Sequence, residues 1–152
     1  MIVTGDAFYR ERMLMSRKLL CAAYAAIALV ALVATWSQNI LFFGGGGSFL
    51  GFWEATKANH ATRSITVDIA LLLLAVAILM VIEARRLGVK FVWAYIIGGF
   101  LIAISVTFPL FLLARELRLE KSDATELRNV DSVLLAALAG FTLAFTIWVD
   151  VV

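Results

Sequence analysis

The stretch from Ser64 to Glu116, SITVDIALLLLAVAILMVIEARRLGVKFVWAYIIGGFLIAISVTFPLFLLARE, decides the fold, because it holds two long apolar runs joined by a short charged turn. A helix needs about 20 apolar residues to cross a hydrocarbon core of roughly 30 Å. Each run approaches or meets that length. We therefore expect two membrane-crossing helices, at about 65–82 and 91–114, around which the rest of the chain packs.

The whole chain has the composition of a membrane protein. Of its 152 residues, 63% are hydrophobic and 16% are charged, whereas soluble domains average about 45–50% and 25%. Two further apolar runs cover about 19–36 and 133–150. The sequence thus predicts one membrane domain over 1–152, of the all-α class: an integral membrane four-helix bundle with antiparallel up-down topology.

The first apolar run is expected to remain as an uncleaved helix. It ends in ALVATWS, which is a poor small-x-small site for signal peptidase. The cationic residues before it form either a cytoplasmic flank or, in part, an over-annotated leader, since Met13 and Met15 are alternative starts. Cys21, the one cysteine, lies within the run and is expected to pack as a small apolar residue.

Residues 40–63 are expected to form a loop, because four consecutive glycines cost too much conformational entropy for a helix interior. The stretch LFFGGGGSFLGFW is too aromatic for free solvent, so the loop should lie along the membrane surface. It is either a linker without a functional role or a lid over a lipid-facing site. His60, near its end, is expected at the protein surface.

Small residues recur at four-residue spacing in three of the predicted helices, which lets a neighbouring backbone approach closely. These packing positions are Ala22 and Ala26 in the first helix, Gly99 and Ala103 in the third, and Ala136, Gly140 and Ala144 in the fourth. The pattern predicts helix assembly, within the bundle and with other membrane subunits or a second copy.

A polar pocket is predicted where Asp68 faces the third helix. Pro109, the only proline, lacks an amide hydrogen and clashes with the carbonyl of Ser105, so a kink is expected there. Asp68 is an ionisable group inside an apolar run, which favours a functional role, although the dipole of a helix N-terminus also explains a structural carboxylate. The pocket residues are Gln38, Asn39, Asp68, Ser105, Thr107, Pro109 and Arg115.

Four alternating crossings would gather these side chains at one membrane face, together with His60, Glu116, Asn129 and Asp131. A direct salt bridge between Asp68 and Arg115 is marginal, because Arg115 lies roughly 9 to 15 Å further along the helix at 1.5 Å per residue.

The charged turn EARRLGVK has two interpretations. Arg85, Arg86 and Lys90 either set topology as solvated residues or bind anionic lipid headgroups. With the N-terminus inside, seven Lys and Arg lie on the inner side and six on the outer side, and the first helix is flanked by four against two. We expect both termini on the cytoplasmic side of a bacterial inner membrane.

Several functions lack the residues they require. One histidine cannot provide bis-histidine haem ligation, and no glycine-rich loop with a lysine precedes a helix as in nucleotide sites. No Ser, His and Asp set has usable spacing. We therefore predict no catalytic residues, no metal, no cofactor and no nucleic-acid partner, with the lipid bilayer as the expected environment.

The segments TWSQN, SITVD, IEARRLGVKFVW and ISVTFPLFLLARE together resemble a family of small bacterial membrane proteins known as domain of unknown function 2834. The resemblance covers roughly Ser16 to Leu119 and implies a short multi-helix membrane protein without an established activity. The chain departs from the family pattern at Gly44–Gly47 and in its longer C-terminal region. The Pro-Leu-x-Leu element before arginine is also faintly similar to neoxanthin-synthase-like membrane proteins.

Abundant packing surface and sparse polar chemistry favour a non-enzymatic role, as a structural or accessory subunit of a membrane assembly. The alternative is a membrane enzyme or carrier for a lipophilic substrate, such as an isoprenoid or quinone, that uses the pocket near Asp68 and Pro109. Replacing Asp68 with Asn would separate the two.

Overall fold

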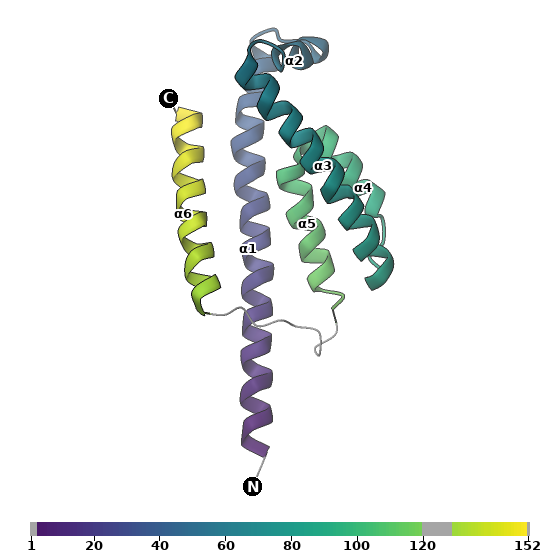
Figure 1. The fold of residues 1–152 in the computed structure, drawn as a ribbon, viewed down its shortest axis with the longest axis vertical. Coiled ribbons are helices and arrows are strands. Elements are labelled where there is room, and N and C mark those ends of the chain that lie inside the picture. Colours follow the sequence, from purple (N-terminus) through teal and green to yellow (C-terminus); the bar gives the residue numbers. More distant parts are fainter. Residues whose placement is uncertain (1–2, 120–128, 152) are drawn as a thin grey trace.

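The computed structural model describes residues 3–119 and 129–151, and all regular structure in these ranges is helical. The elements are α1 (Val3–Gly44), α2 (Phe49–Ala55), α3 (His60–Leu87), α4 (Val92–Gly98), the π-helical turn η1 (Gly99–Ala103), α5 (Ile104–Glu116) and α6 (Asn129–Val151) (Figure 1). The predicted all-α class is confirmed. Among the described residues, four segments are long and apolar enough to cross a membrane: Met15–Gly44, His60–Leu87, Val92–Glu116 and Asn129–Asp150.

The third of these segments folds back on itself, which corrects the prediction of one continuous helix over 91–114. The rings of Tyr95 and Phe111 lie 5.8 Å apart, centroid to centroid, whereas a straight helix would separate these positions by about 24 Å. Arg118, two residues after α5, donates to the carbonyl of Gly88, before α4, at 3.1 Å. The segments α4 and α5 therefore form an antiparallel helical hairpin, here called the short hairpin. Its open end consists of the start of α4 and the end of α5, here called its two feet, which lie beside the end of α3 (Figure 1).

Two glycines and a π-helical turn make the tip of the short hairpin. A Cβ atom on Gly98 would lie 3.0 Å from Cγ2 of Thr107, and one on Gly99 would lie 3.3 Å from Thr107 Oγ1. Glycine at these two positions therefore lets α4 approach α5 closely without displacing Thr107. Ala103 has extended backbone angles, so the helical path breaks there. The reversal thus lies upstream of Pro109, which is buried inside α5.

The core lies where the short hairpin packs against α3. Met80 and Phe111 are fully buried at its centre, and Ala84, Val92 and Ile96 complete the cluster around them. α5 also packs along α1 and lies between α1 and α3 (Figure 1). Most large hydrophobic side chains of α1, α3 and α6 remain exposed, as expected for helices that face lipid.

The glycine run ends a helix, where the sequence predicted a loop over 40–63. The amide of Gly47 donates to the carbonyl of Phe42 at 3.0 Å, and that of Gly46 donates to Phe43 at 3.1 Å. These two bonds form a Schellman motif, with Gly46 in the left-handed region at φ +90°. A Cβ on Gly47 would lie 2.4 Å from the ring of Phe42. The run is therefore a helix stop with defined geometry.

The segment after this stop is also mostly helical. α2 lies across the end of α1, and α3 begins at His60, earlier than the predicted start near residue 65 (Figure 1). Asn59 and Thr62 form a capping box in which each side chain accepts from the other residue's backbone amide. Ser64 and Thr66, which flank the start expected near residue 65, are interior residues of α3.

A sharp turn connects α3 to α4. Gly88 has φ +66°, and Phe91 has φ +60° as the one non-glycine residue with positive φ in the described part of the chain. An aromatic residue in the left-handed region is strained. The turn therefore holds the two helices in a specific geometry at the cost of local strain.

The two ends of the described chain lie at opposite ends of the molecule (Figure 1). The amide nitrogen of Gln38, near the end of α1, lies 3.5 Å from the carbonyl oxygen of Asp150 at the end of α6. Four alternating helices would instead bring the two termini together. The difference follows from the short hairpin. Because α4 starts and α5 ends at the same end of the molecule, the C-terminus of α6 lies at the opposite end from the N-terminus of α1.

Filling the space at the hairpin tip should destabilise the fold. In Gly98→Ala the added methyl meets Thr107 Cγ2, and overpacking of this kind costs about 1–3 kcal/mol. We expect a lower melting temperature, measured by circular dichroism in detergent. Adding Thr107→Ser removes the clashing methyl and should restore stability. Gly140→Ala, which meets no atom within 4 Å, is the control, and equal stability of Gly98→Ala and the parent would contradict the tip geometry.

Candidate functional site

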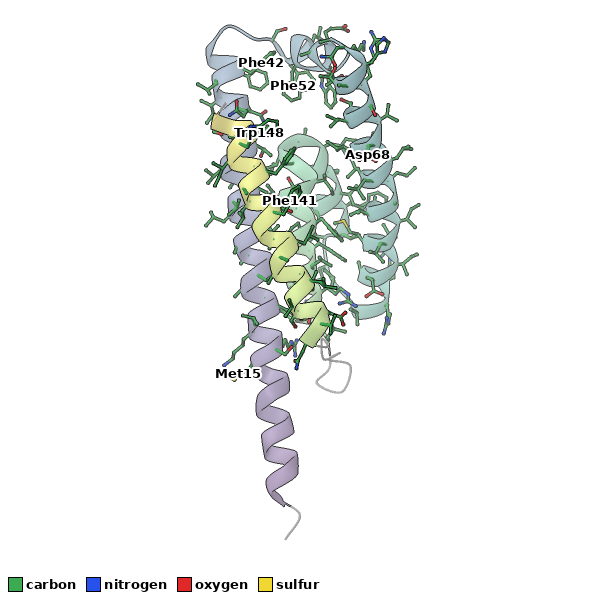
Figure 2. All side chains as sticks on the ribbon, turned by 60° about the vertical axis from the view of Figure 1, so that its left-hand side comes forward. Met15, Phe42, Phe52, Asp68, Phe141 and Trp148 are labelled. Atoms are coloured by element: carbon green, nitrogen blue, oxygen red, sulfur yellow. The ribbon has the colours of Figure 1, made fainter. Side chains whose placement is uncertain are left out.

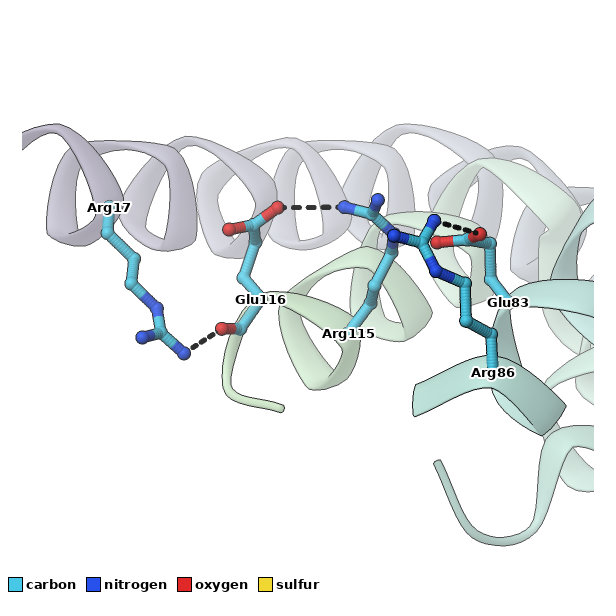
Figure 3. A network of polar contacts seen from close by, with 5 residues as sticks. All are labelled: Arg17, Glu83, Arg86, Arg115 and Glu116. Atoms are coloured by element: carbon cyan, nitrogen blue, oxygen red, sulfur yellow. Dashed lines mark hydrogen bonds and ion pairs between the residues drawn. The ribbon is translucent and has the colours of Figure 1, made fainter. Parts of the chain in front are cut away.

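A network of ion pairs joins three helices at the feet of the short hairpin (Figure 3). Arg115 is its centre: Nε donates to Glu83 Oε2 at 2.6 Å, and Nη1 donates to Glu116 Oε1 at 3.0 Å. The side chains of Arg115, Glu83 and Glu116 are 26%, 12% and 10% exposed. The network therefore places one cation between two carboxylates in a largely desolvated position.

Two further arginines extend this network. Arg17 of α1 donates to the backbone carbonyl of Glu116, and the Nη1 atom of Arg86 lies 3.3 Å from Glu83 Oε1. Every polar side-chain atom that is buried in the described residues has a hydrogen-bond partner. The network thus ties α1, α3 and α5 together.

A cavity of about 580 Å³, which is largely open to the outside, lies at the opposite end of the molecule, among α1, α2 and α3. Five polar and five apolar residues line it, and most of the surface they present is apolar: Gln38, Asn39, Leu41, Phe42, Phe52, Ala55, Thr56, Thr62, Ile65 and Thr66. Figure 2 shows Phe42 and Phe52 beneath α2, between the ends of α1 and α3. Their rings are 5.7 Å apart in a T-shaped contact.

The polar groups of this cavity are uncharged. The hydroxyls of Thr62 and Thr66 donate to the carbonyls of Asn59 and Thr62, at 3.0 and 2.8 Å. These hydroxyl oxygens keep lone pairs that can accept further hydrogen bonds. The side chain of Asn39 is half-buried and makes no hydrogen bond to the described residues. The cavity therefore offers amide donors and several acceptors.

The structure divides the seven residues of the predicted pocket among separate places. Gln38 and Asn39 line the cavity, whereas Arg115 belongs to the ion-pair network at the other end. In α5, Ser105 is exposed. Thr107 is buried beside the hairpin tip, and Pro109 is buried further along the helix. The structure therefore does not bring all seven side chains to one place.

Asp68 is exposed on α3, above the tip of the short hairpin. Gly99 at the tip lies against Leu73, five residues further along α3, and Pro109 lies five residues below the tip in α5. At about 1.5 Å per residue, Asp68 and Pro109 are separated by on the order of 15 Å along the axes. Asp68 makes no ion pair with a described residue, and Arg115 pairs with Glu83 in its place.

The other predicted residues lie at the two ends of the molecule. Arg85 and Arg86 are exposed in the last turn of α3, and Lys90 is exposed in the turn that follows, all near the ion-pair network. His60 is exposed at the first residue of α3, as expected for a surface histidine. Asn129 and Asp131 begin α6 at the end that carries the network (Figure 1). The described residues contain no group of three or more His, Cys, Asp or Glu that could hold a metal ion.

Sequence reasoning missed Glu83 as the partner of Arg115, because it assigned the two residues to opposite faces. It also missed Thr62 and Thr66, since it placed them in a loop and at a helix start. Their four-residue spacing, which puts both hydroxyls on one helix face, was the available signal.

These features define the class of the protein. Four apolar helices and an exterior rich in exposed large hydrophobic residues indicate an all-α membrane protein. The chain belongs to the family described as protein of unknown function DUF2834, whose model matches residues 23–117. The match runs from α1 to the end of α5 and stops before α6. No curated protein and no solved structure matches the chain, and the fainter likeness to neoxanthin-synthase-like proteins is not shown.

Removing the central cation should destabilise the network strongly. Arg115→Met leaves Glu116 without an ion-pair partner and leaves Glu83 with only the exposed Arg86, and breaking such a partly buried pair costs about 3 kcal/mol or more. We expect a clear loss of thermal stability in detergent. Arg86→Gln removes a pairing arginine that is 60% exposed and should cost less than about 1 kcal/mol. Similar losses for the two variants would argue against a central role for Arg115.

Proposed function

We propose that this protein is a non-enzymatic membrane subunit that assembles with other transmembrane helices through α6. The observation that carries the proposal is the packing of α6. None of its described side chains is buried, whereas the segments His60–Leu87 and Val92–Glu116 share a core around Met80 and Phe111. A crossing helix with so little contact inside its own chain is available to a partner.

The surface of α6 has the composition of a helix interface. Ala136, Gly140 and Ala144 form a stripe of small residues, and a Cβ on Gly140 would meet no atom within 4 Å. Small residues favour close packing between helices in lipid. Phe141, Phe145 and Trp148 lie along the same helix with ring centroids 6.3 and 5.8 Å apart. Figure 2 shows α6 on the outside of the bundle, where this surface is free.

The first helix offers a second surface of the same kind. Ala22 and Ala26 are exposed, and Ala28 is the alanine of α1 that is buried against the bundle. The predicted small-residue seam of α1 therefore faces outward in this chain, which supports contacts with a neighbouring subunit.

We further propose that the end of the molecule with the ion-pair network is cytoplasmic. Nine Lys and Arg whose backbone is described belong to this end: Arg10, Arg12, Arg17, Lys18, Arg85, Arg86, Lys90, Arg115 and Arg118. The other end has Lys57 and Arg63, and Lys121 and Arg128 fall outside the described residues. Basic residues mark the cytoplasmic side. The N-terminus is then inside and the C-terminus outside.

The alternative of an enzyme or carrier acting near Asp68 and Pro109 is not favoured, because the geometry separates these residues. The lipid-binding role predicted for Arg85, Arg86 and Lys90 remains compatible with this orientation, since their exposed side chains would lie at the level of cytoplasmic headgroups.

Cysteine labelling in intact cells tests the orientation. In a Cys21→Ser background, cysteines at Lys57 and Asp150 should react with a membrane-impermeant thiol reagent. Cysteines at Lys90 and Arg118 should react only after the cells are broken. Four alternating crossings would instead place Asp150 with Lys90 and would expose Arg118 on the outer side, so labelling of Asp150→Cys and Arg118→Cys distinguishes the two arrangements.

Native mass spectrometry after gentle extraction tests the assembly. The chain at near-native expression should appear in a complex, and Gly140→Leu should convert it to a monomer that keeps its helical content, because the larger side chain blocks close approach. Ala139→Leu adds the same bulk about 100° around the helix and should leave the complex intact. Differently tagged copies then show whether the partner is a second copy.

A lone monomer of the parent chain would count against the proposal. So would a Gly140→Leu variant that assembles as the parent does, since it would place the interface elsewhere.

A further inference from the structure

The cavity beneath α2 exists because the short hairpin spans only part of the distance between the two ends of the molecule. The hairpin tip reaches the level of Leu73, where it lies against α3. Beyond the tip, α1 and α3 continue toward α2 with no helix of the hairpin between them (Figure 1). The space left in this region is the cavity of about 580 Å³, a size typical of small-molecule sites.

The wall of the cavity combines neutral hydrogen-bonding groups with apolar surface. Gln38, Asn39 and three threonines provide amide donors and amide and hydroxyl acceptors, and the other lining residues are apolar. No charged residue lines it. Glu54 and Lys57, which lie nearby on α2 and after it, pair with each other at 3.0 Å and are mostly exposed. A charged group placed in the cavity would lose hydration without gaining an opposite charge.

We propose that this cavity binds an uncharged amphiphile whose head carries carbonyl or hydroxyl oxygens. The half-buried amide of Asn39 has no partner in the described structure and is the donor for such an oxygen. Phe42 and Phe52 contribute flat apolar surface on which a planar head can stack. Leu41 and Ile65 line the cavity and are also exposed, so an apolar tail can leave it along the lipid-facing sides of α1 and α3.

The level of the cavity fits this class of ligand. It lies beneath the aromatic helix α2, which includes Phe49, Phe52 and Trp53. Tryptophan and other aromatic side chains concentrate at the boundary between headgroups and hydrocarbon. An amphiphile there keeps its polar head at the boundary and its tail in the hydrocarbon. This inference concerns α1–α3 and does not depend on assembly through α6.

Tryptophan fluorescence measures the binding directly. Trp53 contacts the cavity residue Phe52, with ring centroids 5.9 Å apart. The full chain in lipid nanodiscs would carry Phe at the other three tryptophans, Trp36, Trp93 and Trp148, with its helical content checked by circular dichroism. A benzoquinone with a ten-carbon tail is the carbonyl probe and a ten-carbon alcohol is the hydroxyl competitor. We expect saturable quenching of Trp53 by the quinone and its reversal by the alcohol.

Two variants test the roles of the Asn39 side-chain amide and of the free volume of the cavity. Asn39→Leu removes the donor at similar volume and should weaken quinone binding about tenfold, the effect of one hydrogen bond. Ala55→Phe fills the cavity without removing a polar group or adding a second tryptophan, and it should abolish saturable quenching. Asn129→Leu, at the other end of the molecule on α6, is the matched control and should bind as the parent does.

Three results would overturn the proposal. Quenching that does not saturate in the parent would show that the quinone is only dissolved in the lipid. Equal affinity of the parent and both cavity variants would exclude this cavity as the site. Displacement of the quinone by decane or by an anionic phospholipid as readily as by the alcohol would exclude an uncharged oxygen-bearing head as the recognised group.

Discussion

The close approach of α4 and α5 at Gly98 is the contact on which the rest of the architecture depends. A Cβ at this position would lie 3.0 Å from the Thr107 methyl, so even an alanine there would require Thr107 to shift. Because the chain reverses here, α5 ends beside the end of α3, and Arg115 meets Glu83. The same reversal leaves α6 to cross alone to the opposite end (Figure 1). One tight contact thus sets the ion-pair network, the position of the C-terminus and the depth of the cavity.

The ion-pair network and the strained turn after α3 serve this reversal. A short helical hairpin that enters the apolar region must satisfy its backbone groups and keep its two feet together. Arg118 bonds to the carbonyl of Gly88, and Arg115 links Glu83 to Glu116, so both feet are tied to α3. Such pairs cost desolvation energy and rarely add much net stability. Here the ion pairs select one position of the short hairpin against α3, where apolar contacts alone would allow several.

The sequence predicted the apolar segments well, because a bilayer imposes a length that composition reveals. It did not predict the path of 91–114, since a run of this length suits a straight crossing as well as two shorter helices that fold back. Gly99 was visible and was assigned to a seam with a partner helix, whereas its neighbours are Thr107 of the same segment and Leu73. The pocket around Asp68 depended on that straight path, and the cavity residues Thr62 and Thr66 were hidden by a helix start placed too late.

The distribution of basic residues supports the folded-back path independently of its packing. Along four alternating crossings the thirteen Lys and Arg divide almost evenly, at seven and six, which is an unusual pattern for a membrane protein because basic residues concentrate on the cytoplasmic side. When 92–116 returns to the end where it began, Arg115 and Arg118 join the other basic residues near Arg86, and Lys57 and Arg63 remain at the opposite end. The charge pattern and the close contacts at Gly98 therefore lead to the same topology from unrelated physical causes.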